Sequence, residues 1–420
     1  MGLAIPRYSL PKIDFAEISR KQPEPCLGNL RVFVRRYASR FYRVEQAGHA
    51  AIYIEGLLSD LSRKTCEPIA IDHGRHRKPL QHFVGAGLWD DEKVLEELQL
   101  HVRQELGDPR GVLVLDPSAF LKKGNHSVGV KRQWSGRLGA KALCQVGVYL
   151  AYAAQGGAAL VDRRLYLPHE WCQSGRRKLG HVPQEVRFQT RQEIALDLLK
   201  KVGPRLPHSF VVGDEEFGRP TWFRKELGRL GKRYVLEVPS NTVIRDLEAV
   251  PPKPRFDRGS LPVTPFRRVD AWAKKQPASK WTRLKIRDTQ KGPLEFEAIR
   301  TTVWTKEDQR IGPTEVLLVT RSLEKDPQYW YWLSNAPLAS LSELVRAASE
   351  RQRIEECFER AKSEAGLAQY EVRSWAGWHH HMTLSMLATW FLTLEARRVG
   401  KKDSGSLPAA DGGGLSHAVA

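Results

Sequence analysis

The chain has 420 residues, and its 67 Lys and Arg against 48 Asp and Glu give a formal net charge of +19. Its 41% hydrophobic and 27% charged residues exclude a collagen-like, coiled-coil or mainly disordered protein. The length predicts about two or three domains with substantial cores. The positive surplus favours attraction to polyanions, nucleic acid before anionic membrane, without specifying a function.

Three features of the sequence predict a cytoplasmic location. The longest mostly apolar run, residues 382–394, is too short to cross a bilayer and predicts a buried helix, so we expect no membrane partner. The start, MGLAIPRYSLPKI, lacks the basic and apolar segments of a signal peptide. Five scattered cysteines without a CxxC pair argue against a disulfide framework and against a zinc site.

The first 240 residues change from helical to mixed periodicity. Residues 30–106 carry apolar side chains at three and four spacing, which predicts a helical bundle. Three β-branched or apolar runs follow, at 111–116, 144–154 and 159–168, and predict strands. A helix at 190–202, a strand at 209–214, a helix at 219–231 and a strand at 233–239 complete a mixed α/β sheet.

The second half begins with a Pro-rich stretch, 250–265, followed by alternating segments that predict strands at 281–288, 294–305, 315–323 and 329–335. Helical periodicity returns at 340–366 and 382–400. We therefore predict a helical N-terminal domain (1–108), an α/β core in two parts (109–240 and 339–400), a β-rich insertion (241–338) and a disordered tail (401–420).

Two aspartates end predicted strands of the core. Asp116 closes GVLVLD and Asp214 closes SFVVGD, and open α/β sheets place their active sites at the ends of strands. The alternative for each aspartate alone is a turn or helix-cap residue.

A third acid lies on a charged helix face. At 100° per residue, Arg351, Glu355 and Lys362 fall within 40° of one another, so an acid is flanked by two bases. Phe358 shares this stripe, which leaves room for partial burial. The alternative is a solvated face with salt-bridge spacing.

Three carboxylates without a His or Cys cluster suit hard divalent cations such as Mg²⁺. Two such ions can activate a water or a 3′-hydroxyl for in-line attack on a phosphodiester. Between Asp116 and Gly180 the chain carries eleven bases against three acids, a net +8. A basic field around an acidic centre is what a nuclease acting on polyphosphate needs.

Several ordered blocks resemble the DDE transposases of bacterial insertion sequences: VLVLDPSAFLKKGNHSVGVKRQWSGRLG, CQVGVYLAYAA with LVDRRLYLP, VVGDEEFG, and the run from RQRIEECFERAKSEAG to TLSMLATWFL. Within that family they resemble the branch with a Tyr, Arg, Glu, Lys signature. The resemblance covers roughly residues 30–400. It implies an α/β, RNase H-like catalytic domain with a helical N-terminal domain and a β-rich insertion.

The resemblance also implies roles for individual residues. Asp116, Asp214 and Glu355 match the three catalytic, metal-binding acids, and the expected cofactor is Mg²⁺, which Mn²⁺ can replace, as two ions per site. Arg351 and Lys362 match the signature Arg and Lys, with three residues between the Arg and the acid and six between the acid and the Lys, and would contact DNA phosphates. Lys122, Lys123 and Arg132 are expected to bind DNA as well.

The chain departs from the family pattern at two places. Ala348 stands where the signature has Tyr, so a contact from that side chain is either missing or supplied elsewhere. Pro117 and Ala119 interrupt the family's usual run after the first aspartate, which bears on the local turn geometry.

Other aromatic and basic residues carry weaker predictions. In this branch a Trp of the insertion often stacks on a flipped base. Trp304, Trp330 and Trp332 are the candidates, and we expect Trp330 to bind DNA. The alternative is that these side chains cover a sheet face. His379, His380 and His381 are expected to be incidental at a helix start. Arg35, Arg36, Arg40 and Arg43 predict either a helix-turn-helix that reads DNA or a packing subdomain.

The combined expectation is an insertion-sequence transposase located with the bacterial nucleoid. It would bind terminal inverted repeats, cleave element ends by metal-dependent hydrolysis and join 3′-hydroxyls to target DNA, as a homodimer that pairs two ends. Alternatives are a catalytically retired copy that regulates by binding DNA, a nuclease without transposition, and a glycosidase-like hydrolase on a carboxylate pair. The +8 stretch argues against the last.

Overall fold

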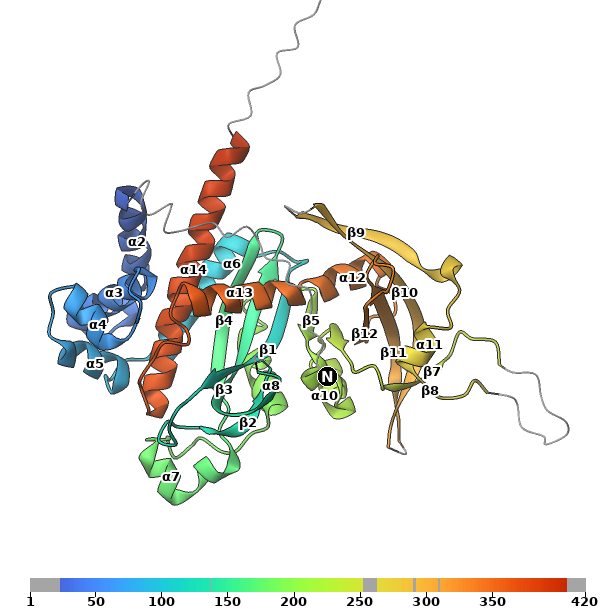
Figure 1. Ribbon diagram of the computed structural model, residues 1–420, viewed down its shortest axis with the longest axis horizontal. Coiled ribbons are helices and arrows are strands. Elements are labelled where there is room, and N and C mark those ends of the chain that lie inside the picture. The colour runs from blue at the N-terminus through green and yellow to red at the C-terminus, as the bar shows by residue number, and fades with distance from the viewer. Residues whose placement is uncertain (1–22, 137, 252–262, 290–291, 309, 406–420) are drawn as a thin grey trace, which may run out of the picture.

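The computed structural model describes residues 23–136, 138–251, 263–289, 292–308 and 310–405. In Figure 1, helices gather at one end of the molecule and strands run through its middle to the other end. Residues 252–262 of the Pro-rich stretch and residues 406–420 of the predicted tail lie outside the described residues.

The N-terminal part is helical, as predicted from its periodicity. Its elements are α2 (Pro23–Tyr37), the short 3-10 turn η1 (Ala38–Arg40), α3 (Val44–Leu58), α4 (Cys66–Asp72), α5 (Arg77–Gly85) and α6 (Asp91–Leu106). Asp90 starts α6 by accepting hydrogen bonds from the N–H groups of Glu92 and Lys93, which satisfies amides that have no partner within the helix.

Of the four arginines that suggested a helix-turn-helix, Arg35, Arg36, Arg40 and Arg43, two are paired with one acid of α6. Arg36 Nε lies 2.8 Å from Glu97 Oε1, and Arg40 Nη2 lies 2.6 Å from Glu97 Oε2. These pairs tie α2 and η1 to α6, so Arg36 and Arg40 serve the packing of the subdomain. Arg35 and Arg43 are exposed, and the helix-turn-helix stays a prediction.

The strands of the described residues form one 12-stranded sheet in the order β2-β3-β1-β5-β6-β12-β11-β10-β7-β8, with β4 on β3 and β9 on β10. Its core strands are β1 (Val112–Leu121), β2 (Lys131–Ser135), β3 (Ala140–Ala154), β4 (Gly157–Leu165), β5 (Phe210–Gly213) and β6 (Tyr234–Glu237). β1 is antiparallel to β3 and parallel to β5, so the sheet is mixed, as expected.

Helices lie against both sides of this core. Successive residues of a strand point to opposite faces: Arg163 of β4 donates to Thr383 of α14 (Trp375–Gly405), and its neighbour Arg164 donates to Asp197 of α8 (Arg191–Val202). Arg163 is fully buried and is also paired with Asp91 of α6. The sheet is thus enclosed between α8 on one face and α6 with α14 on the other.

Three further short helices complete this part: η2 (His169–Cys172), α7 (Ser174–Leu179) and α9 (Glu215–Gly218). Helix α10 (Thr221–Arg229) follows α9 and precedes β6.

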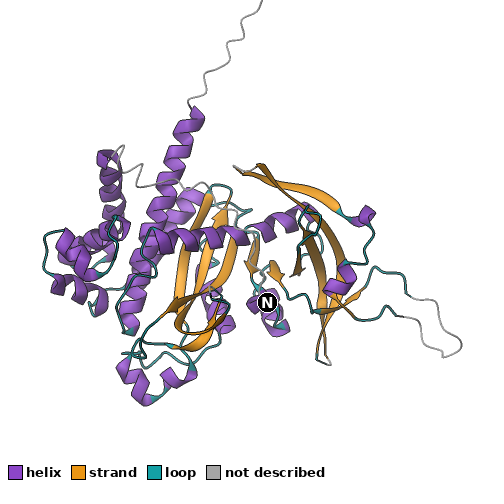
Figure 2. Cartoon of the chain, in the orientation of Figure 1, coloured by secondary structure: helices purple, strands orange, loops and turns teal. Residues whose placement is uncertain are grey.

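The insertion extends the same sheet instead of forming a separate one. Its elements are β7 (Val243–Asp246), β8 (Arg267–Arg268), α11 (Val269–Ala273), η3 (Ala278–Lys280), β9 (Thr282–Thr289), β10 (Gly292–Glu307), β11 (Arg310–Arg321) and β12 (Tyr329–Ser334). The join is antiparallel pairing of β12 with β6, from Trp332 opposite Glu237 to Ser334 opposite Val235. Figure 2 shows these strands at the end of the molecule away from the N-terminal helices.

The predicted helix at 340–366 is two helices, α12 (Leu341–Ser349) and α13 (Arg351–Ser363), which meet at Glu350. The last helix, α14, continues to Gly405, so the prediction of a disordered tail from residue 401 is wrong for residues 401–405. Among the described residues, no helix is both long and apolar enough to span a membrane.

The three consecutive histidines lie near the start of α14, as predicted, and all are buried. His379 contacts the Trp375 carbonyl, His380 the Val84 carbonyl, and His381 both the Tyr53 hydroxyl and the Leu367 carbonyl. Burial lowers the pKa of His380 to about 4 and that of His381 to about 3. His380 and His381 thus join α14 to α5 and α3, whereas His379 bonds within α14.

Candidate active site

Asp116 and Asp214 meet at one corner of the sheet because β1 and β5 are parallel neighbours. Leu115 pairs with Gly213, and each aspartate is the next residue along its strand. Both side chains are half-buried. The sequence prediction that these two carboxylates converge is therefore matched by the geometry.

The prediction that Asp116 ends its strand is wrong. β1 continues to Leu121, with Asp116 opposite Tyr149 and Pro117 opposite Val148 of β3. A proline fits a strand where no neighbour needs its N–H, and pairing with β5 has already stopped at Leu115. Asp116 therefore lies where β1 loses one neighbour, with its backbone still fixed by the other.

Asp214 combines the two roles that the sequence left open. Its side chain accepts the N–H of Glu216 at 3.1 Å and so caps α9. Helix α9 packs so closely on β6 that a Cβ at Gly218 would collide with the Glu237 carbonyl. The cap fixes the carboxyl of Asp214 without removing its second oxygen from the corner.

Glu355 reaches this corner from α13, which packs on β1, β3 and β4 and crosses in front of the strands in Figure 1. Phe358 on the same face is 5% exposed and meets Tyr149 edge-on, with ring centroids 5.0 Å apart. Lys362 Nζ lies 5.4 Å from the centroid of the Phe358 ring. The helix face is thus partly buried, as the position of Phe358 predicted.

The charges of the three acids act on one another. Burial raises the pKa of Asp116 well above its usual range; the carboxylates of Asp214 and Glu355 raise it further, and Arg351 and Lys362 oppose the rise. Burial also raises the pKa of Asp214, against the opposing effect of Arg351. Burial disfavours the charge of Arg351, but the carboxylates of Glu237, Glu355, Asp116 and Asp214 outweigh it and raise its pKa.

Further acids surround this group, and the sequence analysis missed them. Glu237 at the end of β6 is paired with Arg351 at 3.1 Å, and Glu216 is paired with Arg191 at 2.8 Å. Burial raises the pKa of Glu237 to about 6, with Arg351 opposing the rise. The strand-end rule that found Asp214 applies equally to Glu237, since β6 is the next parallel strand.

The donor chemistry of the corner fits a hard divalent cation. Asp116 and Asp214 offer carboxylate oxygens. Burial raises the pKa of both, and the neighbouring carboxylates raise that of Asp116 further, an effect that a cation would relieve. Within the described ranges, no three His, Cys, Asp or Glu side chains are grouped closely enough to hold a metal ion. Glu355 is instead paired with Arg351 at 3.4 Å, so it would have to leave that pair to become a ligand.

The basic residues after Asp116 occupy different environments. Lys123 and Arg132 are exposed. Lys122 points inward, with Nζ 3.3 Å from the centroid of the Tyr370 ring, and burial lowers its pKa to about 7. Lys122 is therefore a poorer phosphate contact than its neighbour.

The three tryptophan candidates of the insertion also differ. Trp332 is 5% exposed and belongs to the core, which removes it as a base-stacking candidate. Trp304 is half-buried, with Nε1 donating to Thr314 Oγ1. Trp330 is half-buried, edge-on to Phe296 at 5.7 Å.

The signature position Ala348 lies near the end of α12 and is 5% exposed. A side chain there faces the core, so this position offers no contact to DNA.

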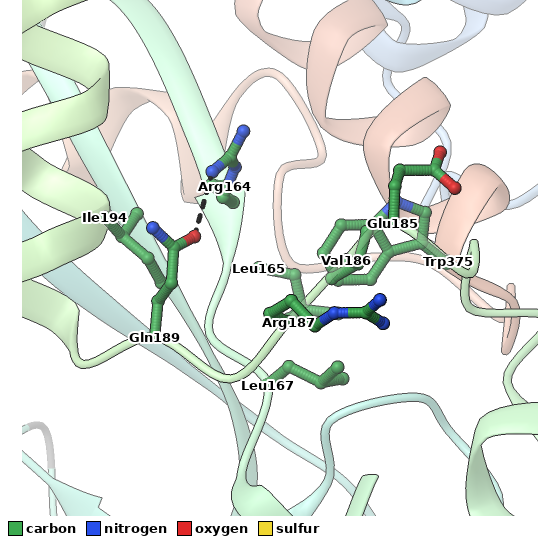
Figure 3. Close-up of a pocket in the computed structure, with 9 residues that line it drawn as sticks. All are labelled: Arg164, Leu165, Leu167, Glu185, Val186, Arg187, Gln189, Ile194 and Trp375. Atoms are coloured by element: carbon green, nitrogen blue, oxygen red, sulfur yellow. Dashed lines mark hydrogen bonds between the residues drawn. The ribbon is translucent and has the colours of Figure 1, made fainter. Parts of the chain in front are cut away.

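A pocket of about 350 Å³ lies apart from the acids, between β4 and the segment before α8. Figure 3 shows Trp375 and Arg187 on one side of it and Arg164 with Gln189 on the other. Its guanidinium groups are already engaged: Arg164 with Gln189 and Asp197, and Arg187 with the Gln184 carbonyl. Of the residues that line the pocket only Glu185 is acidic, so it presents no acid pair.

The sequence matches the family model described as DDE superfamily endonuclease over residues 36–293, more than half of the chain. This range includes Asp116 and Asp214 and ends before Glu355. The chain is also 28% identical over 235 residues to the "Probable transposase for insertion sequence element IS701" of Microchaete diplosiphon. That match covers 54% of this chain and 58% of the relative, less than two thirds of its length. Since the family model spans the strands that carry both aspartates, this chain belongs to the DDE superfamily endonucleases.

Proposed function

We propose that this protein is an insertion-sequence transposase that binds terminal inverted repeats, cleaves the element ends by metal-dependent hydrolysis and joins the 3′-hydroxyls to target DNA. The observation that carries the proposal is the placement of Asp116 and Asp214 beside one another by the paired strands β1 and β5, with the carboxylate of Glu355 near enough to raise the pKa of Asp116. Family membership, which implies an RNase H-like core, and similarity to a probable transposase support it.

Asp116 and Asp214 would hold Mg²⁺, or Mn²⁺ in its place, with Glu355 as the third ligand. Bound as two ions, the metal would lower the pKa of a water or a 3′-hydroxyl and neutralise the leaving oxygen. The sheet fixes the two aspartates, because β1 and β5 are hydrogen-bonded neighbours. Such positioning of the reacting groups accounts for much of the rate enhancement in reactions of this kind.

Arg351 and Lys362 would bind the phosphates on either side of the scissile bond. Both cations influence Asp116, so a phosphate that they bind lies next to the acids. Lys123, Arg132 and Trp330 would bind DNA further along its path. A homodimer would bring two element ends together, as the reaction requires.

The test is cleavage of a labelled duplex that carries the element's own end, by the full chain, with Mg²⁺ or with chelator. The variant is Asp214→Asn, because Asn caps helices as well as Asp does and removes only the charge. Asp90→Asn is the matched control, since Asp90 also caps a helix, α6, with its side chain.

Metal-dependent nicking at the end by wild type and Asp90→Asn, and its loss in Asp214→Asn, is the expected result. End-specific binding without cutting under any divalent ion would point to the retired regulator. Absence of both cutting and end binding would overturn the proposal.

A further inference from the structure

One nitrogen of Arg351 lies between two carboxylates. Nη1 is 3.1 Å from Glu237 Oε2 and 3.4 Å from Glu355 Oε1. The Arg351 side chain is 17% exposed, so the arginine is largely enclosed by this corner. The orientation of the Arg351 guanidinium therefore depends on whether Glu237 or Glu355 remains bonded to it.

The two carboxylates differ in how firmly they are held. Glu237 is 14% exposed on β6, and its backbone is paired with Trp332 of β12. Glu355 is 41% exposed on the surface of α13. Glu237 is thus a fixed anchor, and Glu355 is an acid that can turn away.

The charges make the pair with Glu237 interdependent. Glu215, Asp214 and Glu355 all raise the pKa of Glu237, beyond the effect of burial, and Arg351 is the group that opposes them. Without Glu237, Arg351 would keep Glu355 as the carboxylate bonded to Nη1. An arginine bound to Glu355 competes with any cation for that carboxylate.

We propose that Glu237 is a positioning residue that holds Arg351, so that Glu355 can leave its pair with Arg351 to bind a divalent cation while Arg351 is directed toward a DNA phosphate. This inference rests on the proposed function, since it assumes that the three acids bind metal and act on DNA. Glu237 touches neither DNA nor metal in this role and acts through Arg351.

The test is a double-mutant cycle on the full chain with Glu237→Gln, Arg351→Gln and the double variant. The first readout needs no DNA: the Mg²⁺ concentration that gives half of the Mg²⁺-induced rise in Tm. The second is the rate of nicking at saturating Mg²⁺. Glu215→Gln is the matched control, because Glu215 is an exposed acid near Asp214 and Arg351 and loses the same charge.

Glu237→Gln is expected to raise the half-saturating Mg²⁺ concentration about tenfold, as loss of an outer-shell partner of a metal site does. Adding Arg351→Gln should return that concentration toward the wild-type value, because the competing cation is gone. Glu215→Gln should leave it within about twofold. Nicking should fall in Glu237→Gln and should fall no further when Glu237→Gln is added to Arg351→Gln.

Two results would overturn the inference. A double variant that binds Mg²⁺ as weakly as Glu237→Gln would make Glu237 a metal ligand. Equal Mg²⁺ dependence of Glu237→Gln and Glu215→Gln would leave it without a positioning role. If wild type takes up Mg²⁺ in this way but cuts no DNA, the proposed function falls while the Mg²⁺ cycle still decides the role of Glu237.

Discussion

Asp116 and Asp214 occupy equivalent positions on two parallel strands, each directly after one member of the Leu115–Gly213 pair. Because the two strands are hydrogen-bonded to each other, their pairing fixes the positions of the two carboxylates. The pKa of both carboxyls is raised, first by burial, and for Asp116 next by Asp214. The metal-free protein therefore carries electrostatic strain at its proposed active site.

Removing one of these charges should stabilise the metal-free protein. A carboxyl whose pKa is raised by folding binds more protons in the native state than in the unfolded state. Its contribution to stability is present below the unfolded pKa, near 4, and is lost as pH rises through the folded value. Asp116→Asn should therefore raise Tm by a few degrees at pH 7.5 in chelator, while abolishing cleavage.

The control for that prediction is the same pair of proteins at pH 4, where Asp116 is protonated in the native state and the difference in Tm should vanish. Thermal unfolding followed by circular dichroism gives both values. An Asp116→Asn variant less stable than wild type at pH 7.5 would contradict the strain.

Glu355 should matter for activity but little for stability. Its pair with Arg351 is half-exposed and spans one helical turn, and such pairs contribute about 0.3–0.5 kcal/mol. Glu355→Gln should abolish metal-dependent nicking and leave Tm within about 1–2 °C of wild type. Glu359→Gln, an exposed acid on the same helix, is the control and should retain activity. If both variants lose nicking activity to a similar extent, the loss comes from disturbance of α13 and not from the Glu355 carboxylate.

The insertion depends on a buried ion pair for its attachment to the core. Arg224 of α10 donates to Glu315 of β11 at 2.8 Å, with side-chain exposures of 2% and 0%. Tyr234 of β6 donates to the same carboxylate at 2.6 Å. Because removal of one partner leaves an uncompensated buried charge, Arg224→Met should destabilise the protein by about 3–5 kcal/mol.

The double variant Arg224→Met with Glu315→Leu should recover part of that loss, because no buried charge remains. Urea unfolding of the single and double variants measures this. If the double variant is as unstable as the sum of the single ones, the two residues act independently.

The sequence predicted the strands that are apolar runs or that alternate clearly, and it missed the short strands β2, β7 and β8. Strands such as β1 and β5 are buried on both faces and appear as short apolar runs. β2 (KRQWS) exposes alternate residues at the end of the sheet order and pairs with β3 alone. Only its partner makes it a strand, so a local pattern could not reveal it.

The same limit explains the candidate site. Asp116, Asp214 and Glu355 could be named because an acid after an apolar run and an acid on a helix face are local patterns, although the strand of Asp116 continues beyond it. The role of Glu237 required knowledge that β6 lies beside β5, which is a tertiary fact. Trp330 and Trp332 share one face of β12 by alternation, but β6 pairs with β12 only from Trp332 onward, so the sequence could not tell which one is buried.

The DNA-binding predictions can be separated by salt dependence. Lys122 lies against the Tyr370 ring and is directed inward, and burial lowers its pKa to about 7. Lys123 is exposed. Loss of one phosphate contact reduces the slope of log K against log salt by about 0.9. Lys123→Met should therefore lower the slope by about that amount, and Lys122→Met by much less.

Fluorescence anisotropy with a labelled duplex between 50 and 200 mM salt, a range of about fourfold, measures both. A change in Lys122→Met as large as that in Lys123→Met would mean that the Lys122 amine leaves the Tyr370 ring to meet DNA.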